Sequence, residues 1–413
     1  MKLKLKYIVV NLLLIGIVTL LVSCKKEEVK EVTVRFTSVL PVNTPEEDSI
    51  YIAGTLTPFG LNEWDPVDSS AKLTKIEGRY TIEFTLSEET EYPITINYKY
   101  TRGDWSKVEK GSKGEEINNR SLVIDGSKAL IEKEDYIMSW ADLYENTGVN
   151  TVVGNLDIVT IEDDRFPNTS QQSRKLRIWT PENYDSTDLN KKYPVIYMHD
   201  AQNLFDKNTS FAGEWEVDET IIELMENYAF EGVIIVGIDN SAERMGEYVY
   251  NHDFLTGALG ATKTGNYYMD FLVDIVKPYV DENYNTKPDR LNTYISGSSL
   301  GGLISIFGGL EYLEIFGGIL AFSTSTQLVD AKELPQYFAS LDVALLKETK
   351  YLFYVGTNGD GDVNWPEDYK ELLVDLDVPE ANIHIIVGEN HQHNELAWRT
   401  FFPKAISWLF DLK

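Results

Sequence analysis

Five residues, GSSLG at positions 297–301, have the types and spacing for nucleophilic catalysis. They fit G-x-S-x-G, a turn that holds a serine nucleophile between a strand and a helix. The glycines are needed because a Cβ at those positions would collide with the neighbouring backbone. Residues 291–295 are typical of a short strand, and residues 300–307 of an apolar helix start. Such pentads also occur in ordinary turns, but this context predicts Ser299 as a nucleophile at a helix N-terminus.

A serine of this kind needs a histidine that follows it in the chain. Only His384, His391 and His393 follow Ser299. His384 lies in an alternating strand pattern, and we expect it to project from that strand. The polar loop 388–395 can return an imidazole over the serine, so His393 is the preferred base and His391 the alternative. The competing interpretation is a solvated loop or a weak two-histidine metal site, for which no third ligand stands at a metal-like spacing.

The acid should follow the preceding strand. Residues 351–355 are aromatic and branched, as in a buried parallel strand, and the loop 356–362 comes next. Asp360 is the preferred acid and Asp362 the alternative. A carboxylate there would accept a hydrogen bond from the histidine Nδ1 and fix its tautomer.

A calcium loop is a second interpretation of the same segment. Oxygen ligands alternate at Asn358, Asp360, Asp362 and Asn364. However, Val363 stands where the EF-hand turn needs glycine, and Tyr369 stands where it needs the bidentate glutamate. We therefore expect no metal and no cofactor.

An oxyanion hole requires two backbone N–H groups, one of them from the residue after the nucleophile, Leu300. The second should come from the loop that follows an early strand of the same sheet. Residues 193–198 are typical of that strand, which predicts Ala201 or Gln202 as the second donor. His199 precedes the serine, so we expect it to support the loop.

Four ordered segments now define a resemblance: VIYMHDAQNLF at 195–205, VIIVGIDN at 233–240, PDRLNTYISGSSLGG at 288–302 and HNELAWR at 393–399. With these segments, residues from about 150 to 413 resemble the Putative esterase family of the α/β-hydrolase superfamily. That family includes feruloyl esterases, siderophore esterases, S-formylglutathione hydrolases and mycolyltransferases. The resemblance implies a mostly parallel sheet, a serine esterase activity and the base at His393. It places the acid after residues 351–355, in a loop that departs from the family by one extra residue.

The length and charge of the chain bear on the number of domains and on the class of partner. A chain of 413 residues with 43% hydrophobic residues is too long for one ordinary core. Its formal charge of −29 becomes more negative still if an N-terminal signal with three lysines is removed. Such a charge repels nucleic acid, so we expect no nucleic-acid partner.

The N-terminus has the order of a bacterial secretion signal. Three lysines precede an apolar run at 8–21, and LVSC at 21–24 ends in the single cysteine of the chain. This resembles a lipoprotein lipobox and implies a signal peptide at 1–23, with Cys24 lipidated as a membrane anchor. A charged tether follows at 24–31. The expected location is the bacterial cell envelope, with the lipid anchor at the outer membrane; the sequence leaves open which leaflet, and so whether the chain is surface-exposed. An uncleaved transmembrane anchor is the alternative.

The segment 32–140 has a different pattern. Residues 32–36, 49–53, 80–86 and 94–100 alternate with period two, which predicts a small immunoglobulin-like β-sandwich. With Gly54, NEWDP at 62–66, NYKY at 97–100 and EINNR at 116–120, it resembles a starch-binding module of the family 20 carbohydrate-binding type (CBM20). The resemblance implies that Trp64 and Trp105 stack on glucose rings, and that Lys99 and Asn119 add polar contacts. Packing roles for both tryptophans are the alternative.

The sequence thus predicts a β-sandwich at 32–140 and an α/β-hydrolase at 150–413, joined by a short polar segment. The predicted function is a lipid-anchored serine carboxylic ester hydrolase. It would act on acyl groups of, or near, an α-glucan or other polysaccharide. The alternatives are acyl transfer to sugar hydroxyls and a glycan-binding surface lipoprotein without catalysis. The sequence leaves the acyl group open.

Overall fold

The computed structural model describes residues 32–41, 43–76, 78–87, 90–111, 114, 116–143, 150–168, 171–210 and 213–413. The expected signal peptide, Cys24 and the charged tether lie outside these residues. Among the helices that are described, none is long and apolar enough to cross a membrane. Contacts divide the chain into two compact units. One unit contains the described residues up to Asp104 together with Arg120–Met138, and the other contains Trp105–Asn119 and Ser139–Lys413.

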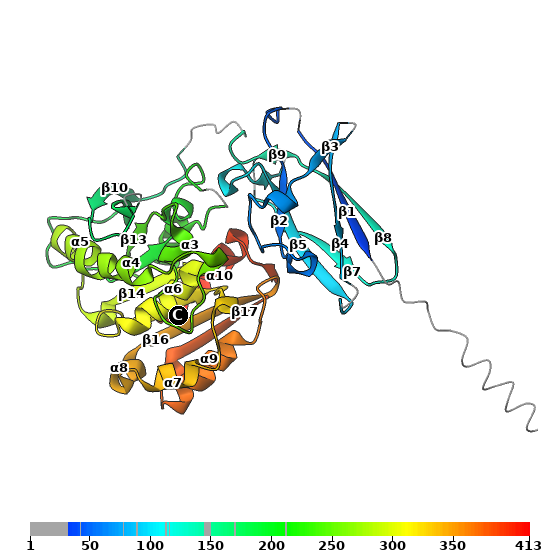
Figure 1. The fold of residues 1–413 in the computed structure, drawn as a ribbon. Helices are drawn as coiled ribbons and strands as arrows, with labels where there is room; N and C mark the ends of the chain where they lie inside the picture. The colour runs from blue at the N-terminus through cyan, green and yellow to red at the C-terminus, as the bar shows by residue number, and fades with distance from the viewer. Residues whose placement is uncertain are drawn as a thin grey trace, which may run out of the picture. The chain divides into compact units, whose positions relative to one another are not determined.

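The first unit is a β-sandwich (Figure 1). Its four-stranded sheet has the order β3-β4-β1-β8, and its three-stranded sheet the order β2-β5-β7. The two sheets share a core in which the rings of Phe36 on β1 and Tyr98 on β5 lie 4.9 Å apart. The expected all-β module is therefore confirmed. Its strands are β1 (Thr33–Val39), β2 (Tyr51–Gly54), β3 (Thr74–Ile76), β4 (Arg79–Thr85), β5 (Ile94–Thr101), β7 (Arg120–Ile124) and β8 (Leu130–Tyr136).

The second unit is built on an eight-stranded sheet of order β10-β11-β13-β12-β14-β15-β16-β17. The first two strands are antiparallel to their neighbours, and the strands from β13 to β17 run parallel. The expected α/β-hydrolase sheet is confirmed. Its strands are β10 (Asn155–Glu162), β11 (Ser173–Thr180), β12 (Val195–His199), β13 (Ile234–Ile238), β14 (Thr293–Ser298), β15 (Gly318–Phe322), β16 (Lys350–Asn358) and β17 (Ile383–Gln392); β6 (Glu109–Lys110) and β9 (Ser139–Trp140) form a separate pair.

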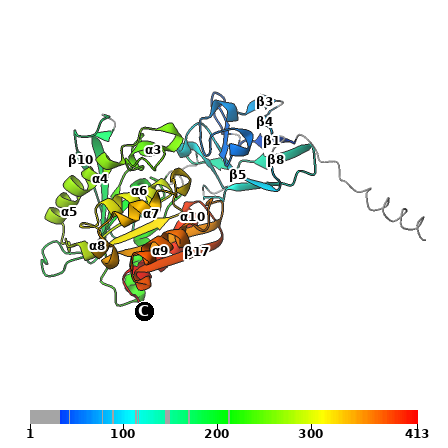
Figure 2. The ribbon, with the colours of Figure 1, turned by 60° about the horizontal axis from the view of Figure 1, so that its bottom comes forward.

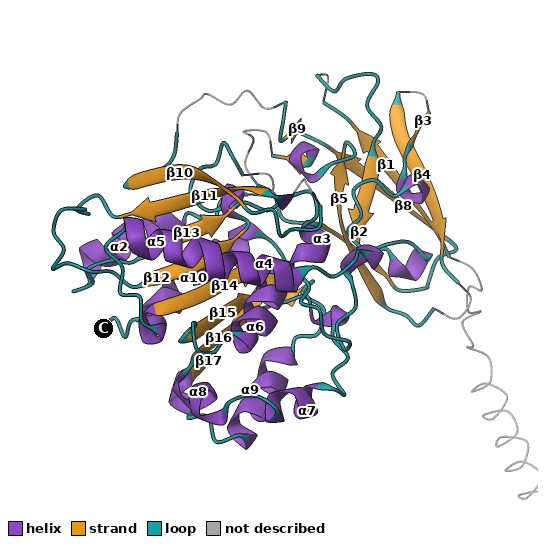
Figure 3. Cartoon of the chain, turned by 60° about the vertical axis from the view of Figure 1, so that its left-hand side comes forward, coloured by secondary structure: helices purple, strands orange, loops and turns teal. Residues whose placement is uncertain are grey.

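Helices cover both faces of this sheet, because apolar side chains of its buried strands point to both sides. One core joins the sheet to α4, α5, α6, α7 and α9, and the other joins it to α2 and α10 (Figure 3). Helix α9 lies against β16 and β17 (Figures 1 and 2). The helices are α2 (Val217–Asn227), α3 (Arg244–Glu247), α4 (Gly265–Phe271), α5 (Lys277–Asn283), α6 (Leu300–Glu311), α7 (Leu334–Ala339), α8 (Val343–Glu348), α9 (Trp365–Asp375) and α10 (Glu395–Leu409).

Two strands extend further than the sequence predicts. Residues 356–358, expected in a loop, belong to β16, and His391, also expected in a loop, lies on β17. The reason is continued pairing: Gly356 lies opposite Gly388, and after a shift of register Asn358 lies opposite Gln392. The longer strands bring the residues after both strand ends to the same edge of the sheet.

Candidate active site

Ser299 occupies the sharp turn between β14 and α6. Its backbone has φ 58° and ψ −121°, a conformation that residues other than glycine rarely adopt. A Cβ added to Gly297 would lie 2.8 Å from the carbonyl carbon and oxygen of Gly301. The turn therefore requires glycine at 297, as the sequence motif implies.

Backbone hydrogen bonds hold this turn in place. The Ser299 N–H donates to the Phe322 carbonyl at 2.9 Å, and the Ser299 carbonyl accepts from the N–H groups of Leu303 and Ser325 at 3.1 and 3.2 Å. The Oγ atoms of Ser299 and Ser325 lie 3.3 Å apart. The residues after β15 thus support the candidate nucleophile from the neighbouring strand.

His393 and Asp360 meet beyond the ends of β17 and β16. The His393 Nδ1 lies 2.8 Å from Asp360 Oδ1, and the Asp360 side chain is fully buried. The second carboxylate oxygen accepts from Ser323 Oγ at 2.6 Å and from the Gly356 N–H. Asp362 is exposed, and its carboxylate accepts from the N–H of Asn364. The structure therefore brings Asp360, and not Asp362, to the imidazole.

Trp398 and Ser323 extend this chain of hydrogen bonds. The Trp398 Nε1 donates to Ser323 Oγ at 2.9 Å, and its ring meets the His393 ring edge to face at 5.3 Å. Sequence reasoning singled out neither residue. Trp398 lies within the HNELAWR segment, which was the available signal. Ser323 follows β15 with φ 43° and matches no motif.

The other two histidines of this region lie elsewhere. The His391 ring packs on Phe401 at 4.8 Å, and its Nδ1 is 3.0 Å from the Glu389 carbonyl oxygen. His384 stacks on Trp408 at 5.2 Å, and burial lowers its pKa. Neither has a contact with Asp360 among the described interactions.

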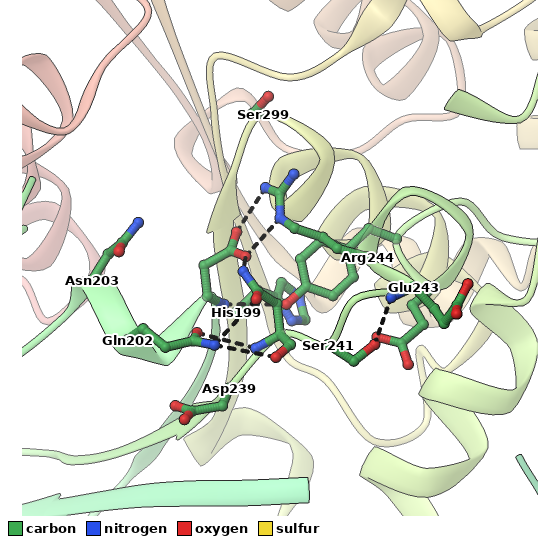
Figure 4. Close-up of polar contacts among 12 residues, drawn as sticks. His199, Gln202, Asn203, Asp239, Ser241, Glu243, Arg244 and Ser299 are labelled. Atoms are coloured by element: carbon green, nitrogen blue, oxygen red, sulfur yellow. Dashed lines mark hydrogen bonds and ion pairs between the residues drawn. The ribbon is translucent and has the colours of Figure 1, made fainter. Parts of the chain in front are cut away.

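The predicted oxyanion donors lie at two helix starts. Leu300 begins α6, and Ala201 begins the short 3-10 helix Ala201–Asn203 after β12. First-turn N–H groups have no partner within their own helix, so they can face a ligand. Figure 4 shows Ser299 and a polar network that includes Gln202 and Arg244.

His199 lies beneath this turn. A Cβ on Gly297 would approach its Cδ2 to 2.8 Å, and its Nδ1 is 2.7 Å from the Tyr268 hydroxyl. Burial lowers the pKa of His199 to about 3, so the ring is neutral at ordinary pH. This placement fits the supporting role that we expect for it.

The four predicted sugar-contact residues fall in both units. Trp64 and Lys99 belong to the β-sandwich unit; Trp64 is half-buried, and Lys99 is only 5% exposed. Trp105 and Asn119 belong to the unit that carries the hydrolase sheet. There the Asn119 carbonyl accepts a hydrogen bond from Gln392 Nε2 at 3.0 Å. Gln392 directly precedes His393 in the chain.

No group of three or more His, Cys, Asp or Glu side chains that could hold a metal is found in the described ranges. Of the alternating oxygen ligands at 358–364, Asp360 directs its carboxylate to His393 and Ser323.

The profile of the family described as "Putative esterase" matches residues 168–403, more than half of the chain. The chain belongs to this esterase family. The family assignment supports a carboxylic ester hydrolase.

Relatives match both parts of the sequence. The endo-1,4-beta-xylanase/feruloyl esterase of Xylanibacter ruminicola is 26% identical over 259 residues, which are 62% of this chain and 31% of that protein. The amylopullulanase of Thermoanaerobacterium thermosulfurigenes is 31% identical over 148 residues, 34% of this chain and 7% of the relative. The chain therefore spans less than a third of the length of these curated relatives.

A solved structure agrees with the fold. The enterobactin esterase FES from Shigella flexneri, crystallised in the presence of enterobactin, matches with a TM-score of 0.50 and 14% identity. The match covers 92% of this chain and 93% of that chain. At this identity the likeness concerns the fold alone.

Proposed function

We propose that this esterase-family chain is a serine carboxylic ester hydrolase with Ser299 as nucleophile, His393 as general base and Asp360 as the orienting acid. The observation that carries the proposal is the 2.8 Å contact between His393 Nδ1 and a fully buried Asp360. The segment 322–325 links this pair to the strained Ser299 turn, because Ser323 donates to Asp360 while Phe322 and Ser325 bond the Ser299 backbone. Each group follows the end of a strand in the parallel part of one sheet, the edge at which such sheets place their reactive side chains.

Acylation follows from these roles. The Ser299 Oγ forms a bond to the acyl carbonyl carbon while His393 Nε2 takes its proton. Asp360 accepts the Nδ1–H hydrogen bond and stabilises the imidazolium. The backbone N–H of Leu300 and that of Ala201 or Gln202 bind the oxyanion. When this intermediate collapses, the bond to the alkoxy oxygen breaks, and the leaving alcohol receives the proton from His393.

Deacylation reverses these steps with water as the nucleophile. His393 takes a proton from water as it attacks the acyl carbon, and returns it to Ser299 Oγ when the acid leaves. A sugar hydroxyl in place of water would give acyl transfer, the alternative within the same mechanism. Product analysis with a competing sugar acceptor separates the two.

A polysaccharide partner is the second part of the proposal. It is supported by the similarity to an amylopullulanase and to a xylanase joined to a feruloyl esterase. We propose that the N-terminal module binds α-glucan with Trp64 of the β-sandwich unit as its stacking residue, and that the ester substrate is on, or near, this glycan. The non-catalytic alternative keeps the glycan binding and lacks the hydrolysis.

The location is the third part. We propose that Cys24 is lipidated after removal of residues 1–23 and anchors the chain in the bacterial cell envelope, at the outer membrane. The support is the order of three lysines, an apolar run and LVSC. Metabolic labelling with a palmitate analogue tests it: the label should be lost in Cys24→Ala, and a label that persists in this variant overturns the anchor.

The enzymatic proposal is tested with p-nitrophenyl esters of acetyl, longer acyl and feruloyl groups. Wild type should hydrolyse at least one of them, and Ser299→Ala should not. The preferred ester defines the acyl group. Equal rates for wild type and Ser299→Ala on every ester would remove the proposed mechanism and leave the glycan-binding alternative.

A further inference from the structure

The loop that carries the predicted oxyanion donors begins with a residue in an unusual conformation. Asp200 directly precedes the 3-10 helix Ala201–Asn203 and has φ 55° and ψ 47°. This left-handed conformation is uncommon for residues other than glycine, although aspartate adopts it more readily than most, and here the contacts of the side chain hold it. Asp200 is 7% exposed, and its contacts therefore come from the protein.

An ion pair holds the Asp200 carboxylate from the start of α3, in the segment that follows β13. Arg244 Nε donates to Oδ1 at 2.7 Å, and Nη2 donates to Oδ2 at 2.8 Å. Asn240 Nδ2 adds a third hydrogen bond at 2.5 Å. Figure 4 marks the hydrogen bonds of the labelled Arg244 with dashed lines. Burial alone would raise the pKa of Asp200, but Arg244 and Asn240 outweigh it and lower the pKa, so the carboxylate stays ionised.

Three hydrogen bonds between Gln202 and Asn240 fix the other end of the same loop. Gln202 Nε2 donates to the carbonyl oxygen and to Oδ1 of Asn240, each at 3.1 Å, and the Asn240 N–H donates back to Gln202 Oε1 at 3.1 Å. Asp200 is further tied through its N–H, which donates to the Tyr248 hydroxyl at 3.2 Å. The N–H of Ala201 thus lies between two anchored residues, and the N–H of Gln202 belongs to one of them.

The loop at residues 200–203 packs directly on the turn that holds Ser299. A Cβ on Gly301 would lie 3.4 Å from Asp200 Oδ2 and 3.3 Å from His199 Cβ. Gly301 belongs to the first turn of α6, the turn that also presents the Leu300 N–H. Any rotation of Asp200 would therefore change the spacing between the two donors of the proposed oxyanion hole.

We propose that Arg244 and Asp200 are positioning residues: their ion pair holds the left-handed turn that aims the N–H of Ala201 or Gln202 at the acyl oxygen. The inference rests on the proposed ester hydrolysis and adds two residues that act through the loop backbone. A planar guanidinium is needed because it bonds both carboxylate oxygens at once, which a lysine does not.

The test compares Arg244→Met and Arg244→Lys with wild type on an uncharged ester. Loss of one oxyanion donor costs roughly 100- to 1,000-fold in kcat, and a displaced donor costs part of that. We expect kcat to fall by about 10- to 100-fold in both variants, with KM changed less than about threefold. The kcat of Asp200→Asn should fall by a similar factor. The kcat of the double variant Arg244→Met/Asp200→Asn should be little lower than that of either single variant, because both residues act on one turn.

A trifluoromethyl ketone provides the readout that a merely structural role would not change. It forms a hemiketal with Ser299, and its oxyanion occupies the same hole. Its inhibition constant should rise in Arg244→Met by the factor by which kcat/KM falls. Arg290→Met is the matched control: Arg290 is also mostly buried, bonding to the carbonyls of Leu313 and Leu345, and we expect it to lower stability without changing the inhibition constant.

Two results would overturn the inference. If Arg244→Met keeps kcat and instead raises KM for anionic esters, Arg244 binds substrate directly. If kcat and the inhibition constant change no more than in Arg290→Met, the ion pair only stabilises the fold. Failure of the proposed function is distinct from both, because wild type would then show no turnover that depends on Ser299.

Discussion

The two units of the chain carry their candidate residues on different kinds of structure. In the hydrolase unit, Ser299, Asp360 and His393 each follow the end of a parallel strand, and sheet topology brings two of them within hydrogen-bond distance. In the sandwich unit, Trp64 lies in a turn with φ 54° and Lys99 is buried in β5. Residues fixed by backbone geometry transfer well from a motif, whereas residues that act by an exposed face depend on side-chain placement.

The largest effect should separate the two candidate acids. Asp360→Asn keeps the size of the side chain but removes the charge that stabilises the His393 imidazolium, so kcat should fall on the order of 10⁴-fold. Asp362→Asn is the matched control; Asp362 is exposed, so we expect activity near that of wild type. Steady-state kinetics on a chromogenic ester measure both. The opposite ranking would move the acid to Asp362.

A second prediction tests the backbone geometry of the hydrolase unit. The Cβ of Gly297→Ala would meet the Gly301 backbone at 2.8 Å, so the turn must shift. We expect a loss of about 1–3 kcal/mol in the free energy of unfolding, together with a loss of turnover. In Gly308→Ala, the control, the three atoms nearest to the new Cβ all belong to the flexible Met269 side chain, which can move aside. Urea unfolding and kinetics compare them, and a fully active Gly297→Ala would contradict this account of the turn.

The third prediction addresses the sandwich unit. If Trp64 stacks on glucose, Trp64→Ala should weaken maltooligosaccharide binding by on the order of 1 kcal/mol, about fivefold, with hydrolysis of a small soluble ester unchanged. Ser299→Ala should show the reverse pattern. Affinity electrophoresis in starch gels measures the binding of both variants. A Trp64→Ala variant that unfolds the module while starch retardation is unaffected would make this tryptophan structural.

The smallest expected effect is on the pH dependence of stability, through the buried carboxyl of Glu214 in the hydrolase unit. Burial raises the pKa of Glu214 to about 7, although a hydrogen bond from Thr151 lowers it. The folded state therefore binds the Glu214 proton more tightly than the unfolded state does. This tighter proton binding stabilises the fold at low pH, and the stabilisation is lost as the pH rises from about 4.5 to about 7.

Glu214→Gln removes that titration. Its melting temperature relative to wild type should be higher at about pH 8 than at about pH 5. Glu226→Gln, on the exposed face of α2, is the control and should show the same difference at both pH values. If Glu214→Gln behaves like the control, this carboxyl has no such role in stability.

Much of the hydrolase fold could be predicted from the sequence, because apolar runs and a glycine-bounded serine follow from local rules. The strand ends were less accessible. Pairing of Asn358 with Gln392 extends β16 and β17 beyond the apolar runs, and tertiary pairing of this kind leaves no local pattern. That extension moved His391 from the expected loop onto a strand.

The supporting residues of the site were beyond sequence reasoning for a related reason. Arg244 and Asp200 are 44 positions apart, and their contact depends on the order of β12 and β13 in the sheet. Ser323 reaches Asp360 across a similar separation. Asp200 itself lies in the family segment VIYMHDAQNLF at 195–205, but its left-handed conformation could be recognised only from the backbone of the structure.

The most direct test of the central claim is labelling with a fluorophosphonate, which forms a covalent bond with an activated serine. Folded wild type should gain one adduct, and peptide mass spectrometry should locate it on Ser299. Ser299→Ala should gain none, and Asp360→Asn should react much more slowly than wild type. An unlabelled folded wild type, or an adduct on another serine such as Ser325, would contradict the assignment of Ser299 as the nucleophile.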